Sequence, residues 1–407
     1  MKYAIVVPDG MADRPVARLG GRTPLEAAAK PHMDQVALRG RLGLVCHTNP
    51  PLPPGSDVAM LSLLGYDPAA CYTGRAPLEA ASMGVPLGPT DVAFRCNLVT
   101  VDGDTMVDHS AGGISTREAA VLIGLLNEKL GSDELRFYPG VGYRHLLVYR
   151  GNGPMAAECT PPHDILDQPI RKHLPRGPGA DILIRLMERS RDLLAPHDIN
   201  DVRIDLGENP ANMVWFWGGG TRPKLAPFAE RYGKRGAVIA AVDLVRGIAV
   251  SLGLDVITVE GATGYIRTNF AGKGAAAVEA LNPYDLVIVH IEAPDEAGHQ
   301  GDIQAKVDAI EAVDKHIVGP LLAALEARGD SRLLVLPDHP TPLEVRTHVA
   351  DPVPFAYCGT GVGERAPGAG DGSGRRFTEA AAAETGLVVA PGHRLMAEFL
   401  GASPASP

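Results

Sequence analysis

Carboxylates and imidazoles follow three apolar stretches of the sequence, where they could bind metal ions. Residues 3–7, 285–291 and 332–337 are largely apolar runs, typical of buried strands. The polar residues after them are Asp9, Asp295, His299, Asp338 and His339, with His348 nine residues further along. Mixed carboxylate and imidazole ligands suit Mn²⁺ or Zn²⁺, whereas an all-oxygen set would suit Mg²⁺ or Ca²⁺. A single pair could be a surface salt bridge or a cap, but three such strand ends favour a metal site.

The number and spacing of these residues predict more than one metal ion. Asp295 and His299 are four residues apart, so both lie on one face if the chain turns helically there. Six candidate ligands and a serine are too many for one tetrahedral site. Two metal ions a few ångströms apart would suit in-line phosphoryl transfer, because one can activate the nucleophile while both neutralise developing charge.

Ser56 is the candidate nucleophile. It follows a proline-rich loop, and the run DVAMLSLL after it reads as a helix that stops at Gly65. A serine there could simply cap the helix through its side chain. The same position also suits a phosphoryl group, since a helix N-terminus offers free N–H groups and the positive end of the dipole. A neighbouring metal ion could make the hydroxyl a nucleophile.

Apolar strand runs alternate with helical patterns, which predicts an α/β fold with a mostly parallel sheet flanked by helices. Helical periodicity covers residues 237–253 and 308–328. In such sheets, ligands bind outside the carboxyl ends of the strands. The chain of 407 residues exceeds the usual size of one core, so we expect two domains.

The middle of the chain has a different pattern, that of an α+β insertion. Residues 92–110 read as a hairpin around Asp102-Gly103, and helices are predicted near 115–130 and 180–194. We therefore expect a core domain of residues 1–79 and 231–407, interrupted by a smaller substrate-binding or cap domain of residues 80–230. Residues 363–376 read as a loop, and SPASP as a loose tail.

Composition argues against several classes of partner. The net charge of −10 argues against a nucleic acid or an anionic membrane, although it does not exclude a local basic pocket for a phosphorylated substrate. The five scattered cysteines read as reduced thiols, and neither a signal peptide nor a membrane-spanning stretch is evident. We therefore expect a cytoplasmic protein.

Several blocks resemble one family over nearly the whole chain. The order of Asp9, Ser56, Asp295, His299, Asp338, His339 and His348 is similar to that of the alkaline phosphatase superfamily. More specifically, the sequence resembles the cofactor-independent phosphoglycerate mutases of the archaeal type. The blocks are PDGMAD, PPGSDVAMLSLLGYDP, YTGRAPLEAASMGV, DVAFRCNLVTVDG, GENPANM and IEAPDEAGHQGD.

The resemblance implies an alkaline-phosphatase-like core with two divalent metal ions. Mn²⁺ is the expected ion, with Zn²⁺, Co²⁺ or Mg²⁺ as alternatives, and no 2,3-bisphosphoglycerate is required. One ion would be held by Asp9, Ser56, Asp338 and His339, and the other by Asp295, His299 and His348. Ser56 would take the phosphoryl group from 3-phosphoglycerate and return it to the 2-hydroxyl of bound glycerate. The enzyme would be an isomerase of glycolysis and gluconeogenesis.

The same resemblance suggests residues that bind or protonate the substrate. His109 is similar to a position proposed for proton transfer, and Arg246 is a further catalytic candidate. The substrate-binding candidates are Arg95, Asn97, Arg144 and Arg222, because guanidinium groups bind phosphate and carboxylate. Loop arginines are often merely solvated. His290 and Glu292 are expected in supporting roles, with Glu292 alternatively a helix cap, and Lys273 reads as a solvated helix residue.

Two other activities stay open at this point. A metal-dependent phosphatase of the same superfamily would have the same metal core and serine, although the long insertion favours a mutase. Some family members have been proposed as homoserine kinases, but the sequence has no P-loop motif. The oligomeric state, a homo-oligomer included, is also open.

Overall fold

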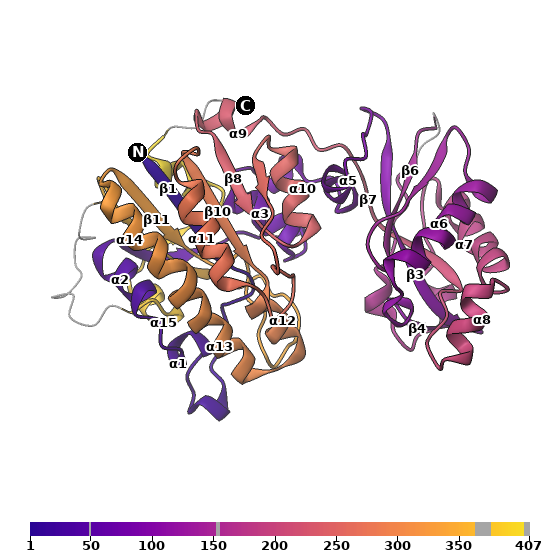
Figure 1. The fold of residues 1–407 in the computed structure, drawn as a ribbon, viewed down its shortest axis with the longest axis horizontal. Coiled ribbons are helices and arrows are strands. Elements are labelled where there is room, and N and C mark those ends of the chain that lie inside the picture. Colours follow the sequence, from indigo (N-terminus) through magenta and orange to yellow (C-terminus); the bar gives the residue numbers. More distant parts are fainter. Residues whose placement is uncertain (49, 152–154, 363–375, 403–407) are drawn as a thin grey trace. The chain divides into compact units, whose positions relative to one another are not determined.

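The computed structural model describes residues 1–48, 50–151, 155–362 and 376–402 (Figure 1). The expected loop at 363–376, apart from Arg376, and the SPASP tail lie outside the described residues. The chain forms two compact units: the core unit, residues 1–72 with 225–407, and the inserted unit, residues 73–224. The expected boundaries fell at 79/80 and 230/231. Residues 76–82 form a helix whose Glu79 pairs with Arg95, and this contact ties the helix to the inserted unit.

The core unit is built on an eight-stranded sheet with the order β13-β2-β12-β11-β1-β10-β8-β9. Its strands are β1 (Lys2–Pro8), β2 (Arg41–Val45), β8 (Gly236–Ile239), β9 (Asp255–Ile257), β10 (Leu286–Ile291), β11 (Ser331–Val335), β12 (Val353–Gly359) and β13 (Val388–Val389). Among the described residues, only β12 runs antiparallel to its neighbours. Val6 pairs with both Val289 and Val335, so β1 lies between β10 and β11. The predicted α/β fold with a mostly parallel sheet is confirmed.

Helices cover this sheet and bury its central strands. The helices of the core unit are α1 (Pro24–Ala27), α2 (Pro31–Arg39), α3 (Ser56–Leu63), α4 (Pro68–Cys71), α9 (Phe228–Tyr232), α10 (Asp243–Ser251), α11 (Phe270–Ala280), α12 (Ala293–Gln300), α13 (Ile303–Val313), α14 (Gly319–Arg328), α15 (Glu379–Glu384) and α16 (Arg394–Leu400). Helices α2, α11, α13 and α14 pack on one face of the sheet, against residues such as Ala4 and Val6. Every residue of β10 is buried, as expected for a strand covered on both sides. No helix in the described part of the chain has the length and apolar character needed to cross a bilayer.

One of the two helical predictions in this unit needs correction, whereas residues 308–328 are helical as predicted. Residues 237–239 belong to strand β8, and helix α10 begins only at Asp243. The short run GAVI pairs with β10, so a tertiary contact overrides the local periodicity there. Helices α13 and α14 are joined by a π-helical turn at Asp314–Val318. At that turn Asp314 accepts hydrogen bonds from the backbone N–H groups of His32 and Met33.

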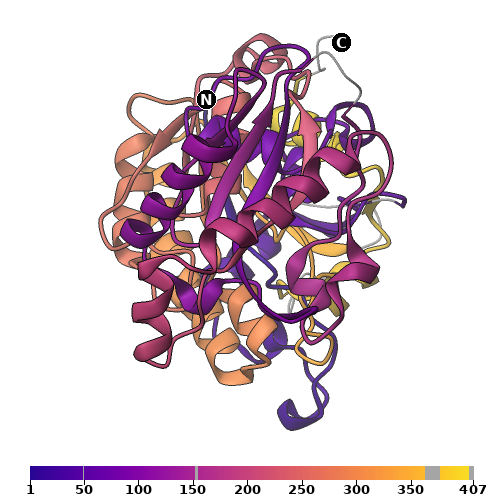
Figure 2. The ribbon, with the colours of Figure 1, turned by 90° about the vertical axis from the view of Figure 1, so that its right-hand side faces the viewer.

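The inserted unit is an antiparallel sheet with helices on both faces. Its strands are β3 (Val92–Asp102), β4 (Thr105–Asp108), β5 (Leu135–Tyr138), β6 (Arg144–Tyr149) and β7 (Met213–Thr221), in the order β4-β3-β6-β5 with β7 also paired to β3. Its helices are α5 (Ala76–Ser82), α6 (Thr116–Leu130), α7 (Ala180–Leu194) and α8 (Asp198–Asp205). Helices α6 and α7 pack on one face of the sheet (Figure 2), and α5 packs on the other through Ala93, Leu146 and Val148. The predicted hairpin and the helices near 115–130 and 180–194 are confirmed.

Candidate active site

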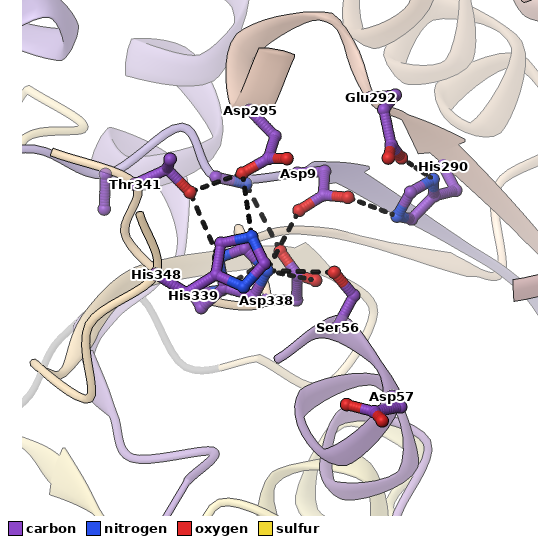
Figure 3. A network of polar contacts seen from close by, with 12 residues as sticks. Asp9, Ser56, Asp57, His290, Glu292, Asp295, Asp338, His339, Thr341 and His348 are labelled. Atoms are coloured by element: carbon purple, nitrogen blue, oxygen red, sulfur yellow. Dashed lines mark hydrogen bonds and ion pairs between the residues drawn. The ribbon is translucent and has the colours of Figure 1, made fainter. Parts of the chain in front are cut away.

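The carboxyl ends of three adjacent strands bring the predicted metal ligands together (Figure 3). Asp9 follows β1, α12 carries Asp295 and His299 after β10, and Asp338 with His339 follows β11. Because β1 lies between β10 and β11, strand order alone places these side chains at one edge of the sheet. Three groups of side chains have ligand atoms within 4.8 Å of one another, namely Asp295-His299-His348, Asp9-Asp338-His339 and Asp9-His290-Glu292.

The first group joins one carboxylate to two imidazoles. Nε2 of His299 lies 3.1 Å from Oδ2 of Asp295 and 3.1 Å from Nε2 of His348. Nε2 of His348 lies 3.5 Å from Oδ1 of Asp295. The predicted helical turn exists, since α12 spans Ala293–Gln300 and places Asp295 and His299 on one face.

The second group surrounds the hydroxyl of Ser56. Nε2 of His339 lies 2.9 Å from Oγ of Ser56, 3.3 Å from Oδ1 of Asp9 and 3.4 Å from Oδ2 of Asp338. Asp338 is held by the backbone N–H groups of Gly10 and His339, which donate to its Oδ1 over 3.3 and 3.0 Å. Asp9, Asp338 and His339 are each only 1% exposed.

Ser56 does not cap its helix. It is the first residue of α3, and the capping position belongs to Gly55, which supplies no side chain. The hydroxyl points instead toward His339 and Asp9 (Figure 3). This leaves the other sequence-based interpretation, a hydroxyl at the positive end of a helix and among metal-ligand side chains.

The donors and acceptors of these side chains are arranged in a way that suits a bound cation. Nδ1 of His299 lies 3.0 Å from the carbonyl oxygen of Arg346, which can only accept, so Nδ1 carries the proton. In the neutral ring, Nε2 then presents a lone pair to Oδ2 of Asp295. Thr341 donates its single hydroxyl proton to Asp295 and lies 3.3 Å from Nδ1 of His339, which must therefore donate to it. In the neutral ring, Nε2 of His339 likewise presents a lone pair to the carboxylates of Asp9 and Asp338, whereas Ser56 can donate its hydroxyl proton to it. A positive charge, either a proton on the imidazole or a bound metal ion, stabilises such an arrangement.

Charge and burial support the same conclusion. Burial and the charge of Asp338 raise the pKa of Asp9 well above its usual range, and burial with the charge of Asp295 raises the pKa of Glu292 to about 8. Both oxygens of Asp9 and Oδ2 of Asp338 are buried without a hydrogen-bond partner among the described residues. Buried carboxylates in such excess are stabilised by metal cations, so the donor set suits divalent ions.

Burial lowers the pKa of His299, whereas the neighbouring Asp295 raises it. The hydrogen bond and charge of Asp295 outweigh burial and raise the pKa of His299 to about 9. Burial would also raise the pKa of Asp295, but hydrogen bonds from His299 and His348 hold it well below its usual range. The pair therefore attracts positive charge, which a bound metal ion would supply.

Supporting side chains lie on the far side of Asp9. Nε2 of His290 lies 3.2 Å from Oδ2 of Asp9, and Nδ1 of His290 lies 3.7 Å from Oε2 of Glu292. Lys273 donates to the carbonyl oxygen of His290 over 2.9 Å. The expectation that Lys273 is solvated is wrong, since it is 1% exposed. It shares the buried face of α11 with Ala277 and Ala280, a helical spacing visible in the sequence.

Sheet register gathers most of the predicted substrate-binding residues in the inserted unit. Arg95 lies opposite Trp217 of β7, and Asn97 lies opposite Arg144 of β6. Opposed residues of antiparallel strands share a face, and alternation along β3 puts Arg95 and Asn97 on the same face. Asn97 accepts from Nε1 of Trp217 over 3.1 Å and donates to the carbonyl oxygen of His109 over 3.3 Å.

Two other candidates are not members of this face. Arg222 is exposed just after β7, and Arg246 lies in α10 of the core unit. Within the part of the chain that the structure describes, neither side chain makes a hydrogen bond, ion pair or ring contact. Their predicted roles, like the proton transfer predicted for His109, stay predictions.

Sequence reasoning missed several residues that the structure places beside the candidates, namely Arg75, Glu79, His163, Trp217 and Thr341. Arg75 and Glu79 are four residues apart on a helix, which the sequence could have shown. Trp217 meets Arg95 only through strand pairing, and Thr341 meets Asp295 only through the fold. His163 lies in a short 3₁₀ helix, Pro162–Ile165, and no local pattern points to it.

Comparisons with known proteins point to one family. A family model described as 2,3-bisphosphoglycerate-independent phosphoglycerate mutase matches residues 37–200. A probable 2,3-bisphosphoglycerate-independent phosphoglycerate mutase of Geobacter sulfurreducens is 53% identical over 98% of this chain and 100% of its own length. A mutase of the same description from Methanosarcina mazei is 54% identical over 88% of this chain and 90% of its own length.

Solved structures agree with these sequence relatives. A protein from Pyrococcus horikoshii has a TM-score of 0.81 and 31% identity, covering 100% of this chain and 99% of its own. A cofactor-independent phosphoglycerate mutase from Thermoplasma acidophilum has a TM-score of 0.65 and 28% identity, covering 98% of this chain and 99% of its own.

Proposed function

The chain belongs to the 2,3-bisphosphoglycerate-independent phosphoglycerate mutase family, and we propose that it interconverts 3-phosphoglycerate and 2-phosphoglycerate through a phosphoserine at Ser56. One observation carries the serine's role. Its hydroxyl lies at the start of α3 and 2.9 Å from Nε2 of His339, inside the second ligand group.

The two ligand groups support the division of metal ligands that the family resemblance implies. Asp9, Ser56, Asp338 and His339 would hold one divalent ion, and Asp295, His299 and His348 the other. Bound there, the ions would favour the ionised serine and neutralise charge on the transferring phosphoryl group. We infer Mn²⁺ as the physiological metal because both groups combine carboxylates with imidazoles, and Zn²⁺, Co²⁺ and Mg²⁺ are the alternatives to test.

The reaction then follows from the chemistry of Ser56. Its Oγ attacks phosphorus, the bond from phosphorus to O3 of the substrate breaks, and O3 takes up a proton. In the second half, O2 of glycerate loses a proton and attacks the phosphoserine, and the bond to Oγ breaks. Thr341 and Arg346 keep His339 and His299 in the tautomers that present Nε2 to the site. Glycerate must stay bound between the two halves and water must be excluded, since water attack would make the enzyme a phosphatase.

We further infer a place in glycolysis and gluconeogenesis, in the cytoplasm. The substrate class supports the pathway. The five cysteines are unpaired, which suits a reducing compartment.

A coupled assay with 3-phosphoglycerate, in the absence of added 2,3-bisphosphoglycerate, tests the activity. We expect 2-phosphoglycerate to form without release of inorganic phosphate, and phosphate alone would establish a phosphatase instead. Ser56→Ala should remove turnover and the mass gain of one phosphoryl group seen in substrate-treated protein. Ser251→Ala is the matched control, because its hydroxyl only donates to the carbonyl oxygen of Gly247 within α10. Substantial turnover by the Ser56 variant would rule out the phosphoserine.

A further inference from the structure

The residue after Ser56 carries a buried carboxylate that does not belong to the metal-ligand groups. Asp57 is the second residue of α3 and is only 6% exposed. Its Oδ1 accepts from the backbone N–H of Val58 over 3.0 Å, and its Oδ2 accepts from the hydroxyl of Tyr72 over 2.5 Å. In Figure 3 the side chain of Asp57 points away from the ligand groups, whereas Ser56 points toward them. The two hydrogen bonds and the positive end of α3 stabilise this buried charge.

The carboxylate of Asp57 folds back over the turn that carries Ser56. A Cβ atom at Gly55 would lie 2.7 Å from Oδ1 of Asp57, so a side chain at that position would displace the carboxylate. The backbone N–H of Ala59 donates to the carbonyl oxygen of Gly55 over 2.9 Å and closes the first turn of α3. The residues on either side of Ser56 are thus linked through one carboxylate.

The tyrosine that holds this carboxylate has a fixed backbone. Tyr72 directly follows the short helix α4, and its N–H donates to the carbonyl oxygen of Pro68 over 2.9 Å. The start of α4 is capped by Asp67, whose Oδ1 accepts from the N–H of Ala69 over 3.0 Å. Tyr72 is also the last residue of the core unit before the chain enters the inserted unit. Its hydroxyl therefore reaches the carboxylate from a backbone position that is itself hydrogen-bonded.

The position of the turn that carries Ser56 matters for attack on phosphorus. A nucleophile that is misplaced by about 1 Å can lose roughly a hundredfold in rate. The 2.9 Å contact with His339 orients the side chain of Ser56. It does not fix the backbone of that residue, which the contacts of Asp57 do. The side chain and the backbone of the nucleophile are thus held by different partners.

We propose that Asp57 and Tyr72 are positioning residues for Ser56. The carboxylate of Asp57 holds the first turn of α3, and the hydroxyl of Tyr72 holds the carboxylate. The effect on turnover rests on the proposed function, whereas the contacts themselves lie within the core unit.

Steady-state kinetics of the full-length enzyme test the role of Tyr72. Tyr72→Phe removes only the hydroxyl, and we expect kcat to fall by roughly tenfold while KM for 3-phosphoglycerate changes by less than about twofold, because the substrate still binds but Oγ is less well aligned. Tyr357→Phe is the matched control, since its hydroxyl donates to the carboxylate of Glu398 over 2.6 Å in the same unit. Its kcat should be unchanged. An unchanged kcat in Tyr72→Phe, or an equal fall in Tyr357→Phe, overturns the proposal.

Variants of Asp57 test whether Tyr72 acts through the carboxylate. Asp57→Ala removes both hydrogen bonds and should lower kcat by roughly a hundredfold. Adding Tyr72→Phe to Asp57→Ala should cause no further loss, because the partner of the hydroxyl is already gone. Asp57→Asn should recover part of the loss, since the amide oxygen can still accept from the tyrosine. A further tenfold fall in the double variant, or an Asp57→Asn enzyme as slow as Asp57→Ala, contradicts the proposal.

Hydrogen exchange separates the positioning from the reaction. In metal-free protein, peptides that cover the first turn of α3 should exchange roughly tenfold faster in Tyr72→Phe than in the wild type, and at the wild-type rate in Tyr357→Phe. If the wild-type protein lacks mutase activity but shows this exchange pattern, only the proposed function fails. If the wild type is an active mutase, and Tyr72→Phe matches it in both exchange and kcat, the inference alone is refuted.

Discussion

The polar groups of the core unit carry an excess of negative charge, whereas those of the inserted unit carry an excess of positive charge. In the core unit, four carboxylates and four imidazoles converge, and the ring nitrogens of His299 and His339 face carboxylate oxygens. In the inserted unit, three guanidinium groups share one carboxylate. The first group lacks positive charge and the second lacks negative charge. The sign of the missing charge supports the proposed ligands. These are metal cations at the ligand groups of the core unit, called the cation site, and an anion at the arginines of the inserted unit, called the anion site, as the family resemblance implies.

A third ionic group shows that burial alone does not make a site. Lys306 is fully buried, and its three donors face Oδ2 of Asp13 at 2.7 Å, the carbonyl oxygen of Thr341 at 2.8 Å and that of Ala12 at 3.5 Å. Asp13 also accepts from the backbone N–H of Leu343. Every charge in this pair is satisfied within the protein, so it needs no ligand. Unsatisfied groups distinguish the two sites from this structural pair.

The strongest test of the comparison removes one charge from the cation site. Asp295→Asn should lower mutase activity by roughly a thousandfold, because a metal ligand that neutralises developing charge contributes several kcal/mol. Activity should also vanish with EDTA and return with Mn²⁺. Asp285→Asn, at the opposite end of the same strand, is the matched control and should stay active. An active Asp295→Asn enzyme would contradict the cation site.

Breaking the buried ion pair of Lys306 and Asp13 should lower the stability of the fold. Lys306→Met leaves Asp13 charged, buried and without its main partner, which we expect to cost about 3–5 kcal/mol in the free energy of unfolding. Urea denaturation measures this. Lys129→Met removes an exposed pair with Glu128 and should cause no measurable change. Equal losses of stability in the two variants would show that the buried pair stabilises the fold no more than the exposed pair does.

A smaller effect on metal binding is expected for Thr341, which contacts the candidate ligands Asp295 and His339. Thr341→Val keeps the shape of the side chain but removes the hydroxyl that binds Asp295 and sets the tautomer of His339. Loss of such an outer contact should weaken metal affinity by roughly 10–100-fold while the fold persists. Metal titrations followed by thermal unfolding report the change. An unaltered Mn²⁺ midpoint would show that Thr341 has no part in the site.

The smallest effect should come from the anion site. Trp217→Phe keeps an aromatic ring near Arg95 but removes the N–H that donates to Asn97. One neutral hydrogen bond is lost, so we expect KM for 3-phosphoglycerate to rise by roughly threefold with little change in kcat. A large fall in kcat with unchanged KM would place Trp217 in the chemical step rather than in binding.

Local patterns explain the grouping of the candidate metal ligands better than the grouping of the arginines in the inserted unit. Asp295 and His299 are joined by a helical spacing, and Asp9 and Asp338 each follow a recognisable apolar run, so residue type and position sufficed. Arg75 and Glu79 have a similar helical spacing. Glu79 and Trp217 reach Arg95 from a helix and a strand far apart in the chain, and no short-range pattern joins them to it. Strand β8 was missed because its pairing with β10 is likewise non-local.

The sequence by itself determined the class of fold, the strand ends that carry metal-ligand chemistry and the serine at the start of a helix. Strand periodicity, helix breaks and residue type are local properties, and each can be read along the chain. Only the tertiary structure decided that Ser56 faces His339 rather than capping α3, that Lys273 is buried, and that His163 lies against Trp217. The balance of donors, acceptors and charges at a site is a sum over distant residues, so it exists only once the chain has folded.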